Sequence, residues 1–146
     1  MSRFLKRLRK EIANCGPHVQ IINEKTIYAG ISLPLEKIEL DIIINLAKNY
    51  PFGPPNIEVN CVDYKDEILK NTTNEIVSNF TNRRCLCCDT ITCRNNWSPH
   101  LTITDCINEV IETIRIKKRI LERIHMRKIQ NKYFHQMDIN EILKFI

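Results

Sequence analysis

The segment CLCCDTITCRNNWSPH, residues Cys85 to His100, holds the side chains of this chain that are most capable of chemistry. Four of the seven cysteines fall within nine residues, just before the only tryptophan, Trp97; they are Cys85, Cys87, Cys88 and Cys93. A cysteine thiolate can act as a nucleophile, ligate a metal ion or pair in a disulfide. The first question is therefore which of these uses the segment supports.

The composition argues against a disulfide framework. The cysteine count is odd, and the first residues, MSRFLKRLRKEI, are basic and amphipathic without an apolar run of the signal-peptide type. No later apolar stretch is long enough to span a bilayer. We therefore expect a soluble intracellular protein, cytoplasmic or nuclear, with no membrane partner. In that reducing setting disulfides are rare, which leaves thiol chemistry, metal binding or burial.

A structural zinc ion is an open alternative for the cluster. Cys85, Cys88 and Cys93, together with His100 or Cys61, have the donor types that surround zinc tetrahedrally. However, two of the cysteines are adjacent and a second clean C-x2-C pair is missing, so the pattern is weaker than that of a zinc ribbon or finger. The first expectation is that the protein holds no cofactor. The other three cysteines, Cys15, Cys61 and Cys106, are expected in the core.

Charge alone does not identify a nucleic-acid-binding protein. The formal net charge is +5, and the basic residues cluster at the amino terminus and between Arg115 and Lys128. Neither cluster has interleaved aromatic residues, and no zinc-finger, helix-turn-helix or RNA-binding signature accompanies them. We interpret both clusters as solvated helix faces and do not expect nucleic acid as a partner.

The elements that must position the cysteine segment begin with a helix and a sheet. Ser2 to Asn14 is predicted to be a helix with an apolar face, ended by Gly16-Pro17. Residues 19–33 predict two strands with a turn near Asn23 to Lys25. From Ile38 to Leu46 apolar side chains recur at every second position, which is typical of a strand with one buried face.

The second half of the chain is predicted to be largely helical. Asn49 to Pro55, NYPFGPP, is a proline-fixed loop, and residues 56–62 form one more strand. Residues 63–76 are charged and compatible with a helix. Thr102 and Asp105 form a capping box for a helix that runs to about Lys132, and a last short helix follows Asp138.

The expected fold class is therefore α+β: an N-terminal helix, an antiparallel meander of about four strands, an active-site loop and C-terminal helices. A chain of 146 residues is the size of one domain, so residues 1–146 are assigned to a single domain. Within it, 63–76 is interpreted as a helical insertion and the part from about residue 116 as a divergent helical tail.

Two motifs in this order of elements resemble the ubiquitin-conjugating enzyme family. YPFGPP at Tyr50 to Pro55 is similar to the YPF-x-PP of that family, and WSPHLT at Trp97 to Thr102 to its W-S-P-x-L-T. The resemblance covers about residues 2–115. It implies the family's α/β fold and a cysteine that carries ubiquitin or a ubiquitin-like protein as a thioester.

The resemblance also indicates which cysteine is the acceptor. The family places it eight or ten residues before the tryptophan and two before an aspartate or small polar residue, which selects Cys87, two before Asp89. The asparagine of the family's HPN motif lies eight residues before the cysteine, which is Asn79. Val77 and Ser78 replace the histidine and proline, and the stretch from Tyr50 to Cys87 is longer than in the family.

The implied reaction is acyl transfer through sulfur. Cys87 would accept the modifier from the activating enzyme, which uses the ATP, and a substrate lysine would then attack the thioester with the help of a RING-type ligase. Asn79 would donate a hydrogen bond to the oxyanion. Asp89 either orients the lysine or is a solvated loop carboxylate. Nearby arginines would favour the thiolate if their guanidinium groups approach it, namely Arg83, Arg84 and Arg94.

The family docks its ligase on the first helix and the two proline-containing loops. By position this assigns five residues to ligase binding: Arg3, Lys6, Arg7, Phe52 and Pro99. Core packing for Phe52 and solubility for the basic residues are the structural alternatives. The competing function is a non-catalytic interaction module of the same fold, which binds ubiquitin or a ligase and uses zinc to stiffen the cysteine loop.

Overall fold

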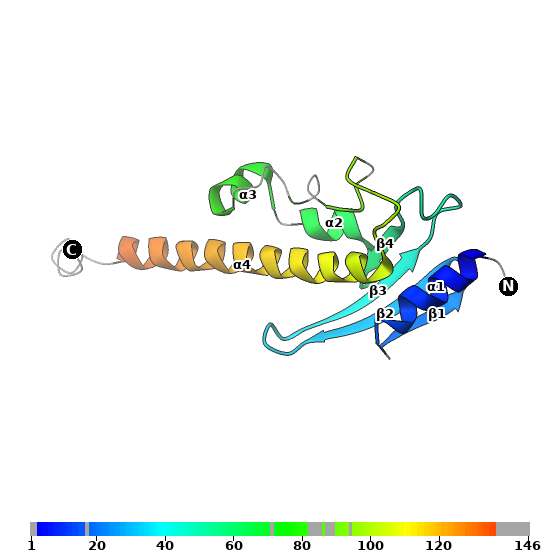
Figure 1. Ribbon diagram of the computed structural model, residues 1–146. Coiled ribbons are helices and arrows are strands. Elements are labelled where there is room, and N and C mark those ends of the chain that lie inside the picture. The colour runs from blue at the N-terminus through cyan, green and yellow to red at the C-terminus, as the bar shows by residue number, and fades with distance from the viewer. Residues whose placement is uncertain are drawn as a thin grey trace.

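The computed structural model describes residues 3–16, 18–70, 72–81, 86, 90–93 and 95–136. Its elements follow in the order α1 (Arg3–Ala13), β1 (Val19–Asn23), β2 (Thr26–Leu33), β3 (Ile38–Asn45), β4 (Asn56–Val59), β5 (Val62–Asp63), α2 (Tyr64–Leu69), α3 (Asn74–Phe80) and α4 (Ile103–Gln136). The fold is thus mixed α+β, with an N-terminal helix, an antiparallel sheet and a long C-terminal helix (Figure 1).

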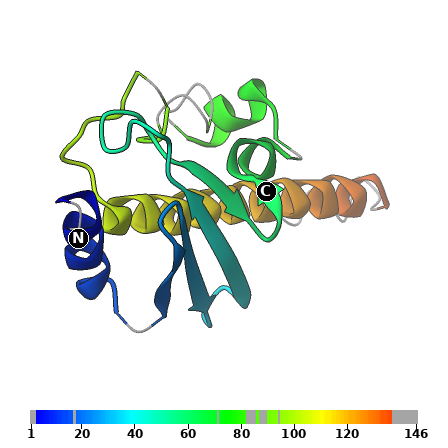
Figure 2. The ribbon, with the colours of Figure 1, turned by 90° about the vertical axis from the view of Figure 1, so that its right-hand side faces the viewer.

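The sheet is a meander whose strands pair in chain order, β1-β2-β3-β4-β5. Each pair is antiparallel, and β2 pairs with β3 without interruption from Thr26↔Asn45 to Leu33↔Ile38. The alternation predicted for the third strand is confirmed, because Leu40, Ile42 and Ile44 are buried on one face. Those side chains join a core to which α4 contributes Ile103, Val110 and Ile114. Figure 2 shows α4 running behind the strands.

The sequence prediction for residues 56–62 was wrong in one respect. The chain does not continue as a single strand but turns back at Asn60-Cys61, so that Val59 pairs with Val62 and a fifth strand forms. Both turn residues have positive φ, 51° for Asn60 and 67° for Cys61, as a two-residue hairpin turn requires. Cys61 is therefore exposed, and the prediction that it lies in the core was also wrong.

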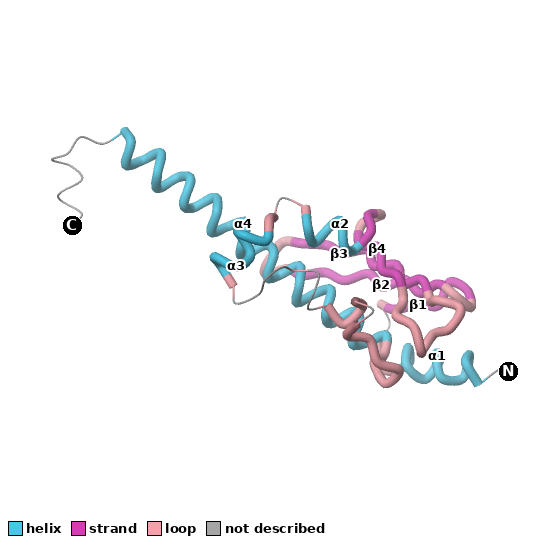
Figure 3. The backbone as a smooth tube through the Cα atoms, turned by 90° about the horizontal axis from the view of Figure 1, so that it is seen from above, coloured by secondary structure: helices cyan, strands magenta, loops and turns pink. Residues whose placement is uncertain are grey.

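The segment predicted as a helical insertion contains two short helices. α2 buries Tyr64 and Ile68 against the sheet core. α3 follows after Thr73, whose side chain accepts a hydrogen bond from the Ile76 amide at 3.3 Å and so caps the helix. α3 lies beside the middle of α4, and α4 extends past it (Figure 3). The final helix predicted after Asp138 lies outside the described residues.

The long helix α4 begins as the capping box predicted. The Asp105 carboxylate accepts from the Thr102 amide at 2.8 Å, and the Asp105 amide donates to the Thr102 hydroxyl at 3.3 Å. From there α4 continues for 34 residues. None of the helices in the described part of the chain is apolar over a length that would cross a membrane.

Candidate functional site

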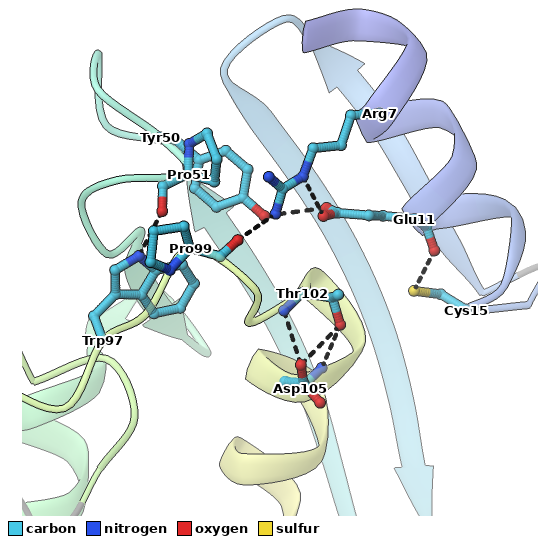
Figure 4. A network of polar contacts seen from close by, with 9 residues as sticks. All are labelled: Arg7, Glu11, Cys15, Tyr50, Pro51, Trp97, Pro99, Thr102 and Asp105. Carbon is cyan, nitrogen blue, oxygen red and sulfur yellow. Dashed lines mark hydrogen bonds and ion pairs between the residues drawn. The ribbon is translucent and has the colours of Figure 1, made fainter.

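Three segments that are distant in sequence meet at one end of the molecule: α1, the Tyr50–Pro55 loop and the Trp97–Pro99 loop (Figure 4). The indole Nε1–H of Trp97 donates to the carbonyl oxygen of Pro51 at 2.8 Å. The rings of Tyr50 and Trp97 lie 6.1 Å apart, within the range of aromatic contacts. The two loops that carry the family resemblance are thus joined by a direct hydrogen bond.

The helix α1 is tied to both loops through Arg7. Its Nη2 donates to the carbonyl oxygen of Pro99 at 2.7 Å, and its Nε lies 2.9 Å from the carboxylate of Glu11. The Arg7 guanidinium also lies 5.8 Å from the centre of the Tyr50 ring. Arg7 therefore contacts the proline of one loop and the tyrosine of the other, an arrangement that fixes the relative positions of all three segments.

Tyr50 is the buried centre of this junction. Its hydroxyl donates to Glu11 Oε2 at 3.1 Å, and the ring of Phe4 packs edge-on against it at 6.1 Å. Burial raises the pKa of the Tyr50 phenol, and the neighbouring Glu11 carboxylate raises it further. The phenol therefore keeps its proton and remains a hydrogen-bond donor over the whole physiological range.

Around this centre lie the residues predicted to bind a ligase. Phe52 directly follows Pro51 and is 76% exposed, so its ring is not a core residue. Pro99 is exposed, as are Arg3 and Lys6 on α1. Arg3 and Arg7 are four residues apart and share one helix face. The junction thus presents an apolar ring and a proline beside a basic helix face.

Two of the predicted catalytic residues, Cys87 and Asp89, lie outside the described residues, as do Cys85, Cys88 and the three predicted arginines. The described residues on either side are anchored. Leu86 is completely buried and Thr90 is 2% exposed. The Thr90 carbonyl accepts from the Asn96 side-chain amide at 2.9 Å and from the Cys93 amide. The described residues that flank Cys87 and Asp89 in sequence, Leu86 and Thr90, are therefore both part of the buried interior.

Asn79 lies in α3 rather than in a loop. It is exposed, whereas Val77, two residues earlier, is buried at 1% exposure. Asn79 lines a groove between α3 and α4, next to Phe80 and the arginines of α4. Val77, Ser78 and Asn79, which the resemblance aligned with the HPN motif, are thus helical, and Asn79 lies beside α4.

The described cysteines are all free thiols: Cys15, Cys61, Cys93 and Cys106. Cys106 is fully buried, as predicted, and burial strongly raises the pKa of its thiol. Cys15 packs partly buried against the core, with its Sγ 2.9 Å from the Thr104 hydroxyl. The environment of Cys106 suits a structural residue, because a reactive thiol needs a lowered pKa and access.

The zinc prediction lies largely outside the described residues, since it requires Cys85 and Cys88. Cys93 is half-buried and His100 is exposed. In the described part of the chain no three His, Cys, Asp or Glu side chains come together as a metal site would need.

Sequence reasoning missed two features. Glu11 is the acidic residue that joins Arg7 and Tyr50. Its i,i+4 spacing from Arg7 was the sequence feature that could have predicted the ion pair. A row of arginines on α4, Arg119, Arg123 and Arg127, lines the groove beside α3. The four-residue spacing of these arginines could have predicted that they share one helix face.

No protein-family model, curated protein or solved structure matches this chain.

Proposed function

We propose that this protein is a ubiquitin-conjugating enzyme, which carries ubiquitin or a ubiquitin-like protein as a thioester on Cys87. The observation that carries the proposal is the hydrogen bond between Trp97 Nε1 and the Pro51 carbonyl. YPFGPP and WSPHLT are 46 residues apart at this contact, yet they form one packed unit with α1. Two motifs that match the family and also cooperate in space support the resemblance more strongly than two separate matches in sequence.

The chemistry needs one accessible sulfur on a fixed loop. The Cys87 thiolate attacks the carbonyl carbon of the thioester on the activating enzyme, a new C–S bond forms, and that enzyme's thiolate leaves. In the second step a substrate lysine amine attacks, the Cys87 thiolate leaves and the amine loses a proton. Leu86 and Thr90, the described residues on either side of this segment in the sequence, are buried, and the proposed reaction requires the Cys87 sulfur to be positioned close to its acyl donor.

Ligase docking is assigned to the junction surface. Phe52 and Pro99 supply a preformed apolar spot, and Arg3, Lys6 and Arg7 supply positive charge beside it. Affinity at such surfaces depends on a few central residues, and rim charges mainly accelerate association. Because Arg7 also holds Pro99, its replacement would disturb the surface as well as its charge.

The second candidate is a non-catalytic interaction module of the same architecture. The placement of Asn79 favours it, because an exposed position in α3 beside α4 gives this residue a role at the groove instead of at a thioester. In that case the junction would still dock a partner, but Cys87 would accept nothing.

A charging assay distinguishes the two candidates. Purified protein is incubated with activating enzyme, ubiquitin and ATP, and the adduct is tested with reducing agent. We expect a reductant-sensitive adduct that becomes a reductant-resistant oxyester or disappears in Cys87→Ser, while Cys85→Ser and Cys88→Ser still charge. Adducts that persist in Cys87→Ala would assign the thioester to another cysteine, and no adduct with any modifier tested would favour the interaction module.

Two further variants test the assigned partners of Cys87. Asn79→Ala should charge normally but discharge to free lysine about a hundred- to a thousandfold more slowly, as the loss of an oxyanion donor predicts. Phe52→Ala should charge and discharge normally alone but lose stimulation by a RING-type ligase. An unchanged discharge rate in Asn79→Ala would remove this residue from the catalytic mechanism.

A further inference from the structure

The groove between α3 and α4 is separate from the junction of α1 with the proline loops. It has a volume of about 610 Å³, and a smaller hollow of about 150 Å³ adjoins it at Phe80, Arg119 and Arg123. Ile116 and Ile120 of α4 line the smaller hollow, and Phe80 and Met126 line the larger one. The groove therefore combines apolar surface with positive charge.

The positive charge comes from one row of side chains on α4. Arg119, Arg123 and Arg127 follow each other at four-residue spacing, about 6 Å apart along the helix axis. All three are exposed. Across the described part of the chain, the ion pairs of the structure involve none of them. Glu122 also lines the groove, but its carboxylate lies 3.8 Å from Lys118 Nζ, so the three guanidinium groups leave a net positive charge along the groove.

Arg115, at the start of the same row, already forms an ion pair with a carboxylate. Arg115 precedes Arg119 by four residues, and its Nε lies 2.8 Å from Glu36 Oε1 in the loop between β2 and β3. A carboxylate of another element therefore already neutralises one end of the row. Further along α4, no carboxylate of another element forms an ion pair with Arg119, Arg123 or Arg127 among the described residues.

The apolar part of the groove favours a protein ligand over nucleic acid. The Arg127 guanidinium lies 4.4 Å from the centre of the Phe80 ring and covers it, so this ring is not free to stack on a base. The Arg123 side chain is directed to the same place, with Nη1 3.4 Å from the Phe80 carbonyl. Phosphates would contact the arginines but would gain nothing from Met126, Ile116 or Ile120.

From this combination we propose that the α3–α4 groove binds an acidic amphipathic helix of a partner protein. Carboxylates at i, i+4 and i+8 of that helix would match the spacing of the arginine row, and apolar side chains on its adjacent face would cover the exposed Met126 and the partly buried Ile116. The proposal does not depend on ubiquitin transfer. It gives the protein a second docking surface at the opposite end of the core from the junction.

The test uses fluorescence anisotropy with labelled peptides of about 16 residues, long enough for the three acidic positions and a turn on either side. Three peptides carry Glu at i, i+4 and i+8. They differ in where Leu lies relative to the Glu positions, so that each presents its apolar residues on a different adjacent face of the helix. A fourth peptide has Lys in place of Glu. A single-stranded DNA of about 20 nucleotides is the competing probe. All titrations are made near physiological ionic strength, about 150 mM, because exposed charges are screened by salt.

Two triple variants that lose the same amount of positive charge distinguish binding at the arginine row from general electrostatic attraction of the peptide to a basic protein. The groove variant is Arg119→Gln, Arg123→Gln, Arg127→Gln, and the control is Lys65→Gln, Lys128→Gln, Lys132→Gln, whose residues are exposed and do not line the groove. We expect at least one acidic peptide to bind, the groove variant to weaken binding about tenfold or more, and the control to change it less than about twofold.

Circular dichroism melting of both variants checks that each remains folded. Equal weakening by both variants would overturn the proposal, because the row would then act only through net charge. Failure of all three acidic peptides to bind the wild-type protein would also overturn it. Tighter binding of the DNA than of the peptides, lost in the groove variant, would assign the groove to nucleic acid instead.

Discussion

From Ile103 to Ile120, α4 lies against the core, whereas from Leu121 to Gln136 it extends beyond it. The first half buries six apolar side chains almost completely, namely Ile103, Cys106, Ile107, Val110, Ile114 and Ile120. In the second half Ile124 is the last apolar residue packed against the core, and beyond it three large side chains are about half exposed, with Met126 at 53%, Ile129 at 48% and Tyr133 at 51%. One continuous helix therefore has a first half that packs in the core and a second half that is largely exposed.

The basic part of α4 begins within its first half, at Arg115, and continues through the second half. The sequence from Arg115 to Lys132 contains eight Lys and Arg residues and a single acidic residue, Glu122. A basic helix without buried apolar contacts gains little from packing, so its second half is stabilised mainly by continuity with the first. The first half begins beside the junction, and the groove arginines span the boundary, with Arg119 at the end of the first half and Arg123 and Arg127 in the second. This separation along α4 suggests that the two docking surfaces can be changed independently.

The largest difference between the two halves should appear when the same substitution is made in each. Ile107→Ala removes a side chain that is 5% exposed and should lower the free energy of unfolding by about 2–5 kcal/mol. Ile129→Ala removes one that is 48% exposed and should change it by less than about 0.5 kcal/mol. Urea unfolding measures both. Comparable losses would mean that the second half of α4 is covered in solution.

The sequence predicted the elements whose signals are local. The alternation of apolar residues located β3, and the capping box located the start of α4. The hairpin at Asn60-Cys61 was missed because its positive φ angles are usually marked by glycine, and neither residue is one. Cys61 was therefore predicted to be an apolar position of a continuous strand, although it is an exposed turn residue.

The candidate site was only partly predictable for a different reason. Phe52 and Pro99 were identified from their motifs, and the structure brings their loops together with α1. The bond from Arg7 to Pro99 joins residues 92 positions apart, and no local pattern encodes such a contact. The groove depends on α3 packing beside α4, which charge and periodicity in residues 63–76 did not indicate. The roles of Cys87, Asn79 and Asp89 stay predictions.

The next largest effect concerns the contact that joins the loop before α4 to the Tyr50–Pro55 loop. Trp97→Phe keeps an aromatic ring but removes the donor to the Pro51 carbonyl, so the free energy of unfolding should fall by about 1–2 kcal/mol. Amide hydrogen exchange should also accelerate at Phe52, whose amide donates to the Asn49 carbonyl within that loop. Unchanged exchange would mean that the loop is held by packing alone and does not need the indole hydrogen bond.

The smallest effect is expected at Lys117, where the buried half of α4 meets the basic half. Lys117 is 7% exposed and its Nζ donates to the Glu67 carbonyl. Burial lowers the pKa of this ammonium group below its usual 10.5; nearby Glu67 partly opposes the shift, and Lys70 adds to it. Below the folded-state pKa both states bind the proton. Between that pKa and 10.5 the unfolded chain binds more protons than the folded one, so stability must rise with pH in this window.

Lys117→Met isolates this contribution because methionine has a similar length and does not titrate. The free energy of unfolding of the wild-type protein, relative to that of Lys117→Met, should increase as the pH is raised toward 10.5. Lys128→Met provides the matched control, since Lys128 is exposed in the second half of α4 and the same difference should then be flat. Chemical unfolding at a series of pH values measures both curves. A flat curve for Lys117→Met as well would show that Lys117 is hydrated in solution, and the boundary between the two halves of α4 would then lie before it.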